Sequence, residues 1–158
     1  MARMANFRLA ITIANDLDQV WLVRASVRAI LDEMDVADID CLHVQLAISE
    51  AVNNCIKHSY QGGRQGEVDI LIDVDRERLQ IEIADDGVPL RVEEMENLLK
   101  RPVPEPGAVL ELLPNGRGLQ IIRDTMDSVV FSRRDDRNVV RLCKTLRRQL
   151  ADSGVFDG

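Results

Sequence analysis

The sequence predicts an α+β fold, in which strand hairpins and amphipathic helices occupy separate stretches of the chain. Two observations support this class: apolar and polar residues alternate in several short runs, and apolar residues recur at helical spacing in longer ones. At 158 residues the chain is long enough for one core and too short for two comfortable ones. We therefore expect a single domain over residues 1–158, with a C-terminal tail at about 148–158.

The first part of the chain supplies a strand and two helices. Residues 7–14 (FRLAITIA) alternate and are rich in strand formers, which predicts an opening strand. Asp16 stands at the N-cap of a first helix, with Gln19 in the capping-box position. A second helix is predicted from about Asp38 to His58, and the residues 61–63 (QGG) end it. The apolar residues of the first helix follow at helical spacing: Leu17, Val20, Val23, Val27, Ile30, Leu31 and Met34.

Two hairpins follow in the second part of the chain. The first joins strands at residues 68–74 and 79–85 through a short polar turn, Asp75 to Arg78. The closing hairpin joins residues 128–133 to 138–145 around two aspartates.

The connection between the hairpins is long and irregular. A short helical piece is predicted around Val92–Leu99, and another helix starts near Gly118. Between them the chain is rich in helix breakers: Pro102, Pro104, Pro106, Gly107 and Pro114. So many prolines in a connection of this length favour a mobile loop over packed structure.

Composition and charge exclude several classes of protein. The formal net charge of −7 argues against nucleic acid as a direct partner, because phosphate neutralisation needs a basic face. The cysteines, Cys41, Cys55 and Cys143, are odd in number and form no CxxC, so neither a disulfide framework nor a zinc site is indicated. No apolar run approaches the roughly 20 residues of a membrane span, and no signal-peptide pattern opens the chain. We expect a cytoplasmic protein that does not enter the membrane.

The segment ISEAVNNCIKHSY, residues 48–60, carries polar groups that an ordinary helix does not need. On a helical wheel Glu50 and Asn54 fall on one arc, with His43 and His58 on the same side. Another, broad arc is apolar: Val44, Ile48, Ala51, Val52, Cys55 and Ile56. The polar arc is explained either by simple solvation or by chemistry, in which an amide oxygen holds Mg²⁺ and a carboxylate one turn away accepts a proton. Asn is a poor residue for a helix interior, which favours the second interpretation.

Two further motifs bear on the same question. In the alternating strand that ends IEIADDG, Asp85 points to the same side as the core isoleucines, and Gly87 follows. Either this is a strand-ending turn, or the inward carboxylate meets a donor such as an adenine amino group, with the glycine making room for the base. Gly116, Arg117 and Gly118 lead directly into a helix, either as a flexible connector or as a phosphate site built from free backbone N–H groups.

Taken in order, E-x-x-x-N on a helix, D-x-G after a strand and G-x-G before a helix resemble the motifs of the GHKL (Bergerat-fold) ATPases. The surrounding text, SEAVNNCIKHSY and GRGLQIIRDTMDSV, is most similar to the anti-sigma-factor serine kinases of that superfamily. The resemblance extends from Phe7 to Leu146. It implies a two-layer α/β sandwich with a mixed, mainly antiparallel sheet, helices on one face and ATP in the helical layer.

The resemblance also implies a role for each motif. Asn54 would bind Mg²⁺, and Glu50 would be the general base that deprotonates a serine hydroxyl during attack on the γ-phosphate. Asp85 would accept a hydrogen bond from adenine, with Gly87 beside the ring. Gly116, Arg117 and Gly118 would bind the phosphates, beneath an ATP lid at about residues 88–115.

Two features depart from the family pattern. Pro89 stands where relatives often have a second glycine. Arg137 and Asn138 stand where a Gly-Thr pair commonly starts the last strand and helps to order adenine, and Asn138 offers a polar side chain there.

The function implied is that of an anti-sigma factor with serine kinase activity in a partner-switching system. Such a protein binds a sigma factor or another output protein, phosphorylates a STAS-domain anti-anti-sigma protein on a serine, and forms a homodimer. An alternative is a nucleotide-dependent binding module that sequesters its partner without significant phosphotransfer. Glu50 favours the enzyme, since binding ATP needs no base at that position.

Overall fold

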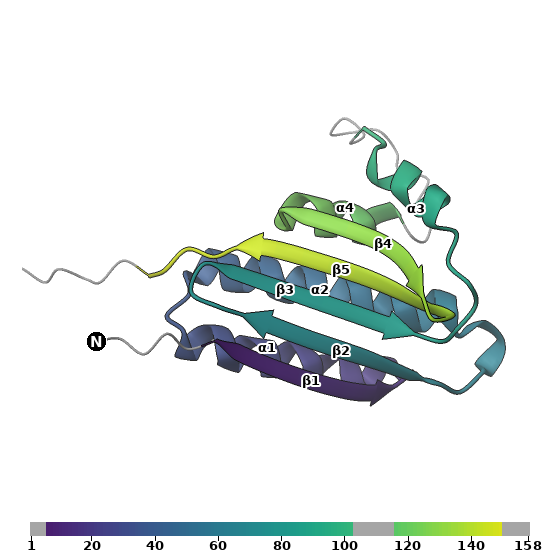
Figure 1. The fold of residues 1–158 in the computed structure, drawn as a ribbon, viewed down its shortest axis with the longest axis horizontal. Coiled ribbons are helices and arrows are strands. Elements are labelled where there is room, and N and C mark those ends of the chain that lie inside the picture. The colour runs from purple at the N-terminus through teal and green to yellow at the C-terminus, as the bar shows by residue number, and fades with distance from the viewer. Residues whose placement is uncertain (1–5, 103–115, 150–158) are drawn as a thin grey trace, which may run out of the picture.

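The computed structural model describes residues 6–102 and 116–149. Within them the chain forms a sheet with helices packed against it (Figure 1). The strands are β1 (Phe7–Ala14), β2 (Glu67–Val74), β3 (Arg78–Asp85), β4 (Ser128–Arg134) and β5 (Arg137–Thr145). The α-helices are α1 (Val20–Glu33), α2 (Asp38–Ser59), α3 (Val92–Leu99) and α4 (Gly116–Thr125), and the short 3₁₀ turns are η1 (Leu17–Gln19) and η2 (Gln61–Gly63).

The sheet has the strand order β1-β2-β3-β5-β4. Every neighbouring pair in it is antiparallel, so the expectation of a mixed sheet is wrong for the described residues. Short turns join β2 to β3 and β4 to β5 and so make these two pairs antiparallel, and β1 and β5 also run opposite to β2 and β3 beside them. At the β4–β5 turn, Asp135 and Asp136 adopt φ angles of 50° and 62°, as a tight hairpin turn requires.

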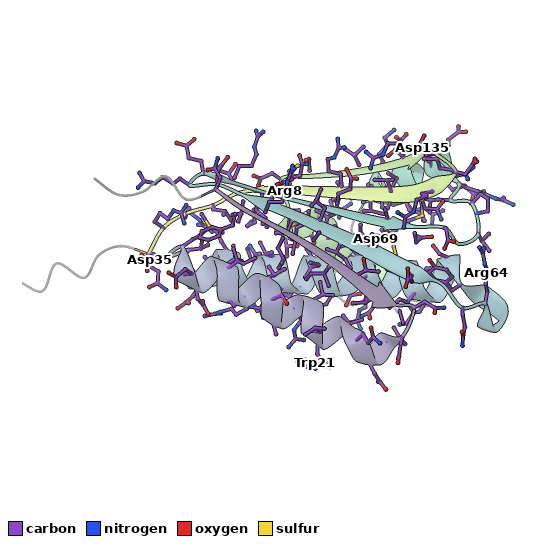
Figure 2. The ribbon with its side chains drawn as sticks, turned by 60° about the horizontal axis from the view of Figure 1, so that its bottom comes forward. Arg8, Trp21, Asp35, Arg64, Asp69 and Asp135 are labelled. Atoms are coloured by element: carbon purple, nitrogen blue, oxygen red, sulfur yellow. The ribbon has the colours of Figure 1, made fainter. Side chains whose placement is uncertain are left out.

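The fold class α+β and the two-layer arrangement are confirmed. Figure 2 shows the sheet as one layer and the helices as the other, with Arg8 and Asp69 on the sheet and Trp21 on the outer side of α1. The core lies between the layers and is built from aliphatic residues, among them Leu31, Ile48, Ile70, Ile72, Leu79, Ile81, Ile83 and Leu142. The apolar arc predicted for the second helix is buried along its whole length.

The first helix begins differently from the prediction. Asp16 does act as a cap, since its side chain accepts a hydrogen bond from the N–H of Asp18, but the cap closes the turn η1. Gln19 accepts instead from the N–H of Ala14, 3.1 Å away, and so ties the helix start to the end of β1. The capping box is therefore replaced by a link between the strand and the helix.

The connection after β3 is better packed than its prolines suggest. Helix α3 lies where the helical piece was predicted, beside the β4 end of the sheet (Figure 1). Its half-buried apolar residues, together with Leu90, pack against the core: Val92, Met95, Leu98 and Leu99. The predicted helical piece is thus confirmed, and its amphipathic face packs against the core before the cluster of prolines begins. Residues 103–115 of the predicted lid, and 150–158 of the predicted tail, lie outside the described residues.

None of the helices in residues 6–102 and 116–149 is both long enough and apolar enough to cross a membrane.

Candidate active site

The polar arc of α2 faces the start of α4 and is partly open to solvent. Glu50, Asn54 and His58 follow one another at intervals of four residues, and all three are half-buried. Within the described residues, the side chains of Glu50 and Asn54 make no hydrogen bond. The polar arc therefore presents the Glu50 carboxylate and the Asn54 amide, which remain available to a ligand.

Helix α4 begins against this line. A β-carbon placed at Gly118 would lie 2.6 Å from Oε2 of Glu50, and 3.4 and 3.5 Å from the amide nitrogen and oxygen of Asn54. With glycine at this position, the first turn of α4 lies this close to the two groups without displacing the Glu50 side chain. Because the first backbone N–H groups of a helix have no partner within the helix, this turn brings hydrogen-bond donors beside the carboxylate and amide of α2.

Asp85 ends β3 and is 1% exposed, facing the helical layer as its alternation with Ile81 and Ile83 predicts. Its Oδ1 accepts from the N–H of Gly87 at 2.9 Å and from the amide of Asn138 at 2.9 Å. Its Oδ2 accepts from the thiol of Cys55 at 3.3 Å. The carboxylate is thus buried but supplied with donors, as a buried acid requires.

Asn138 joins β5 both to Asp85 and to the segment that follows β3. It pairs with Asp85 in the β3–β5 register and is 3% exposed. Its amide nitrogen also donates to the carbonyl of Val88 at 2.9 Å, and its Oδ1 accepts from the N–H of Leu90 at 2.7 Å. The residue therefore fixes the start of the connection that leads to α3, in the place where relatives were expected to carry threonine.

Close packing between the end of β3 and the end of α2 requires glycine at position 87. A β-carbon there would lie 2.1 Å from the backbone oxygen of Ser59, at the end of α2. The N–H of Val88 donates to the same oxygen at 2.7 Å. The glycine thus lets the end of β3 lie directly on the end of α2, and its role beside an adenine ring stays a prediction.

A cavity of about 310 Å³ lies between α2, the ends of β3 and β5, and α3. Asp85, Asn138 and Cys55 form its polar end, and Asn54 and His58 line the side toward α2. Its remaining walls are mainly apolar: Ala51, Val88, Pro89, Leu90, Met95, Leu98, Leu119, Ile122, Phe131 and Val140. An apolar slot with a few convergent polar groups is the usual form of a small-molecule site.

One buried polar atom beside the cavity has no hydrogen-bond partner in the part of the chain that the structure describes. Nε2 of His58 is inaccessible to solvent and makes no hydrogen bond within the described residues. Buried polar atoms in folded proteins are rarely left in this state, so the unpaired nitrogen suits a site completed by a ligand.

The structure brings the predicted residues together in two groups. Asn54 and Asp85 line the same cavity, while Glu50 and Gly118 meet beside Asn54. Gly116 opens α4, and Arg117 is exposed on its first turn. Sequence reasoning missed other members of the cavity: Cys55, Ser59, Met95 and Leu98. Cys55 was assigned to the apolar core, and only its position next to Asn54 hinted at the cavity.

Comparison with known proteins finds similarity over most of the chain. Residues 13–144 match the family model described as histidine kinase-like ATPase domain. The serine-protein kinase RsbW of Bacillus licheniformis is 29% identical over 138 residues, covering 87% of this chain and 85% of the relative. That of Bacillus cereus is 28% identical over 148 residues, covering 92% and 89%. The crystal structure of the RsbU and RsbW domains of Rv1364c from Mycobacterium tuberculosis superposes with a TM-score of 0.62 at 17% identity, covering 92% of this chain and 35% of that one.

Proposed function

Because the chain belongs to the histidine kinase-like ATPase domain family, we propose that it is an anti-sigma factor that phosphorylates a serine of a STAS-domain partner with ATP. Family membership implies ATP binding, and the resemblance to the anti-sigma-factor serine kinases of the GHKL superfamily is confirmed. The transfer reaction, its substrate and the partner proteins are the proposal.

The observation that carries the proposal is the meeting of Glu50, Asn54 and Gly118. A carboxylate without a hydrogen-bond partner in the described residues lies beside the N-terminal turn of α4, where phosphate oxygens are stabilised. In the proposed reaction a serine hydroxyl bonds to the γ-phosphorus while the bond to the bridging oxygen of ADP breaks. Glu50 takes the hydroxyl proton, which makes it the general base.

Asn54 fits the place of a magnesium ligand. Its amide oxygen is a hard, neutral donor, and it lies on the same side of α2 as the helix start that would receive the phosphates. Mg²⁺ is typically held by one or two protein oxygens together with substrate phosphates, which one amide matches. Bound there, the ion would neutralise charge on the phosphates during transfer. His58, with its unpaired Nε2, lies one turn further along α2 toward the cavity.

The cavity suits the adenine end of the nucleotide. Asp85 would accept from the exocyclic amino group, and the apolar walls would enclose the flat faces of the base. Nucleotide would then extend from Asp85 past Asn54 to the start of α4, with the phosphates at Gly116, Arg117 and Gly118. Arg117, exposed on the first turn of α4, would be a charge partner of the phosphates.

The test compares two substitutions one turn apart on α2. With Mg-ATP and the STAS-domain protein of its own organism, wild type should add one phosphoryl group, detected as a mass gain on serine. Glu50→Gln should keep nucleotide affinity and lower the transfer rate about 10²- to 10⁴-fold, since it removes only the base. Asn54→Ala should weaken magnesium-dependent nucleotide binding as well.

The outcomes separate the enzyme from its alternative. Transfer at the wild-type rate by Glu50→Gln would remove that residue from the mechanism. If wild type binds ATP and its partner but never transfers phosphate, the protein is a nucleotide-dependent binding module.

We further propose a homodimer that forms through the edge strand β1. Among the residues that the structure describes, this strand is paired only with β2, and it carries a single charged residue, Arg8, whose guanidinium is engaged by Asp73 at 2.6 Å. An edge strand of this length with a single charge, itself engaged by Asp73, is a ready template for pairing with a second chain. Ala10→Lys, at the centre of the strand, should shift the dimer toward monomer in analytical ultracentrifugation. Ser132→Lys, on the opposite edge strand β4, is the matched control; equal effects of both would refute the choice of edge.

A further inference from the structure

The two oxygens of the Asp85 carboxylate have different hydrogen-bond partners. Oδ1 receives two strong donors, the backbone N–H of Gly87 and the amide of Asn138, each at 2.9 Å. These bonds join the end of β3 to β5 and to the turn that follows, so they hold the local fold. An oxygen that already accepts two structural hydrogen bonds has little capacity left for a ligand.

Oδ2 has a different partner. Within the described residues it accepts only from the thiol of Cys55, at a sulfur–oxygen distance of 3.3 Å. A thiol is a weak donor compared with a hydroxyl or an amide. Burial, and then the adjacent Asp85 carboxylate, raise the pKa of the Cys55 thiol well above its ordinary value, so the sulfur keeps its proton near neutral pH. Oδ2 is therefore satisfied in the free protein, but by a bond that is easily exchanged.

We propose that Cys55 is a positioning residue of the adenine site, whose thiol holds Oδ2 of Asp85 in the free protein and yields it to the exocyclic amino group of adenine. Cys55 lines the same cavity as Asp85, so a base in that cavity would meet Oδ2 beside the thiol. This inference rests on the proposed function, because it assumes that adenine occupies the cavity.

The strength of the donor at position 55 should then set nucleotide affinity. Cys55→Ser replaces the weak donor by a strong hydroxyl donor that competes with adenine for Oδ2, so ADP should bind about 3- to 10-fold more weakly. Cys55→Ala leaves Oδ2 without a donor before binding, so ADP should bind about 2- to 10-fold more tightly. The free Cys55→Ala protein should also unfold at a lower temperature than wild type, since it buries an unsatisfied carboxylate oxygen.

The opposite direction of the two shifts is what a purely structural role cannot produce. Calorimetric titration with ADP should therefore be run on wild type, both Cys55 variants, and Cys41→Ser and Cys41→Ala as controls. Cys41 is buried in the same helix, where its thiol lies 3.6 Å from the carbonyl of Val36. Its substitution should leave ADP affinity within about 2-fold of wild type.

A second ligand sharpens the test. Purine riboside diphosphate lacks the amino group, so it should bind more weakly than ADP and show no ordering among the position-55 variants. The proposal is supported if ADP binds more weakly to Cys55→Ser and more tightly to Cys55→Ala than to wild type, and purine riboside diphosphate shows no such differences. Equal affinities, or shifts of the same sign in Cys55→Ser and Cys55→Ala, overturn it while wild-type ADP binding leaves the proposed function intact. Absence of ADP binding to wild type instead refutes the proposed function. Should Cys55→Ser fail to fold, the sign of the Cys55→Ala shift decides.

Discussion

Single residues at the polar end of the cavity show how a buried acid is supplied with hydrogen-bond donors. Asp85 satisfies one oxygen with structural donors and the other with a weak one. The alternation of β3 predicted the direction in which this carboxylate points, since residues two apart share a face. It could not predict the donors, because Cys55 and Asn138 come from parts of the chain 30 and 53 residues away.

The substitution Asp85→Asn should preserve the fold and abolish tight binding of adenine nucleotides. An amide at position 85 can keep its oxygen on the Gly87 and Asn138 donors, which places an N–H₂ group where Oδ2 was. Two donors would then face each other, at a cost to ADP binding on the order of 2–4 kcal/mol. Calorimetric titration with ADP measures this loss, with circular dichroism to confirm folding.

The matched control is Asp86→Asn. Asp86 follows Asp85 directly but is exposed, and its carboxylate accepts from the hydroxyl of Tyr60 at 2.9 Å on the outside of the cavity. This change should leave ADP affinity nearly untouched. Unchanged affinity in Asp85→Asn itself would remove that residue from the site.

Among the secondary-structure elements, the α2–α4 contact is the one that assembles the proposed chemistry. The helical periodicity and the glycines predicted both helices, and the bounds found lie close to those expected. What the sequence alone could not supply was their contact, because Glu50 and Gly118 lie far apart along the chain and no spacing rule relates them. The same limit applies to α3. Its amphipathic face could be predicted from the sequence, but the part of the core that it covers could not.

Two glycine substitutions should separate activity from stability at this level. Gly118→Ala meets the end of a flexible side chain, Oε2 of Glu50, which is able to move aside. Stability should change by less than about 1 kcal/mol, while transfer should fall about 10-fold or more as the base is displaced. Gly87→Ala meets the rigid backbone oxygen of Ser59 at 2.1 Å, so it should destabilise the fold by about 2–3 kcal/mol.

Urea unfolding and phosphotransfer assays on the two variants measure both effects. The control for changes in helix propensity is Gln120→Ala. Gln120 is half-buried and lies one turn into α4. A strongly destabilised Gly118→Ala would mean that α4 cannot tolerate the side chain, and the link to Glu50 would fail.

At the scale of the whole molecule, a buried charge cluster ties the end of the sheet to the start of α2. Asp40 is 1% exposed and accepts from the backbone N–H of Arg147 at 2.8 Å and from its guanidinium at 2.6 Å. Lys144, also buried, lies 3.8 Å from the same carboxylate and donates to the carbonyl of Thr125, at the end of α4. The cluster thus joins both layers at the end of the molecule opposite the cavity. Sequence periodicity gave no sign of it, since Asp40 reads as an ordinary first-turn acid.

Replacing Asp40 by Asn should lower the free energy of unfolding by about 2–3 kcal/mol. This is less than the full cost of breaking a buried pair, because Arg147 is largely exposed.

Burial alone would raise the pKa of Asp40, but the hydrogen bonds from Arg147 and the charge of Lys144 hold it below its ordinary value of 3.8. A lowered folded-state pKa contributes stability that is complete above the unfolded-state value and is lost as the pH falls through the folded-state value. The difference between wild type and Asp40→Asn should therefore stay constant from about pH 5 to 7 and shrink below about pH 4. Urea unfolding across this range measures it, with Asp38→Asn, an exposed acid in the same helical turn, as the control. A difference that is absent at neutral pH, or that grows on acidification, would show that the cluster does not hold the two layers together.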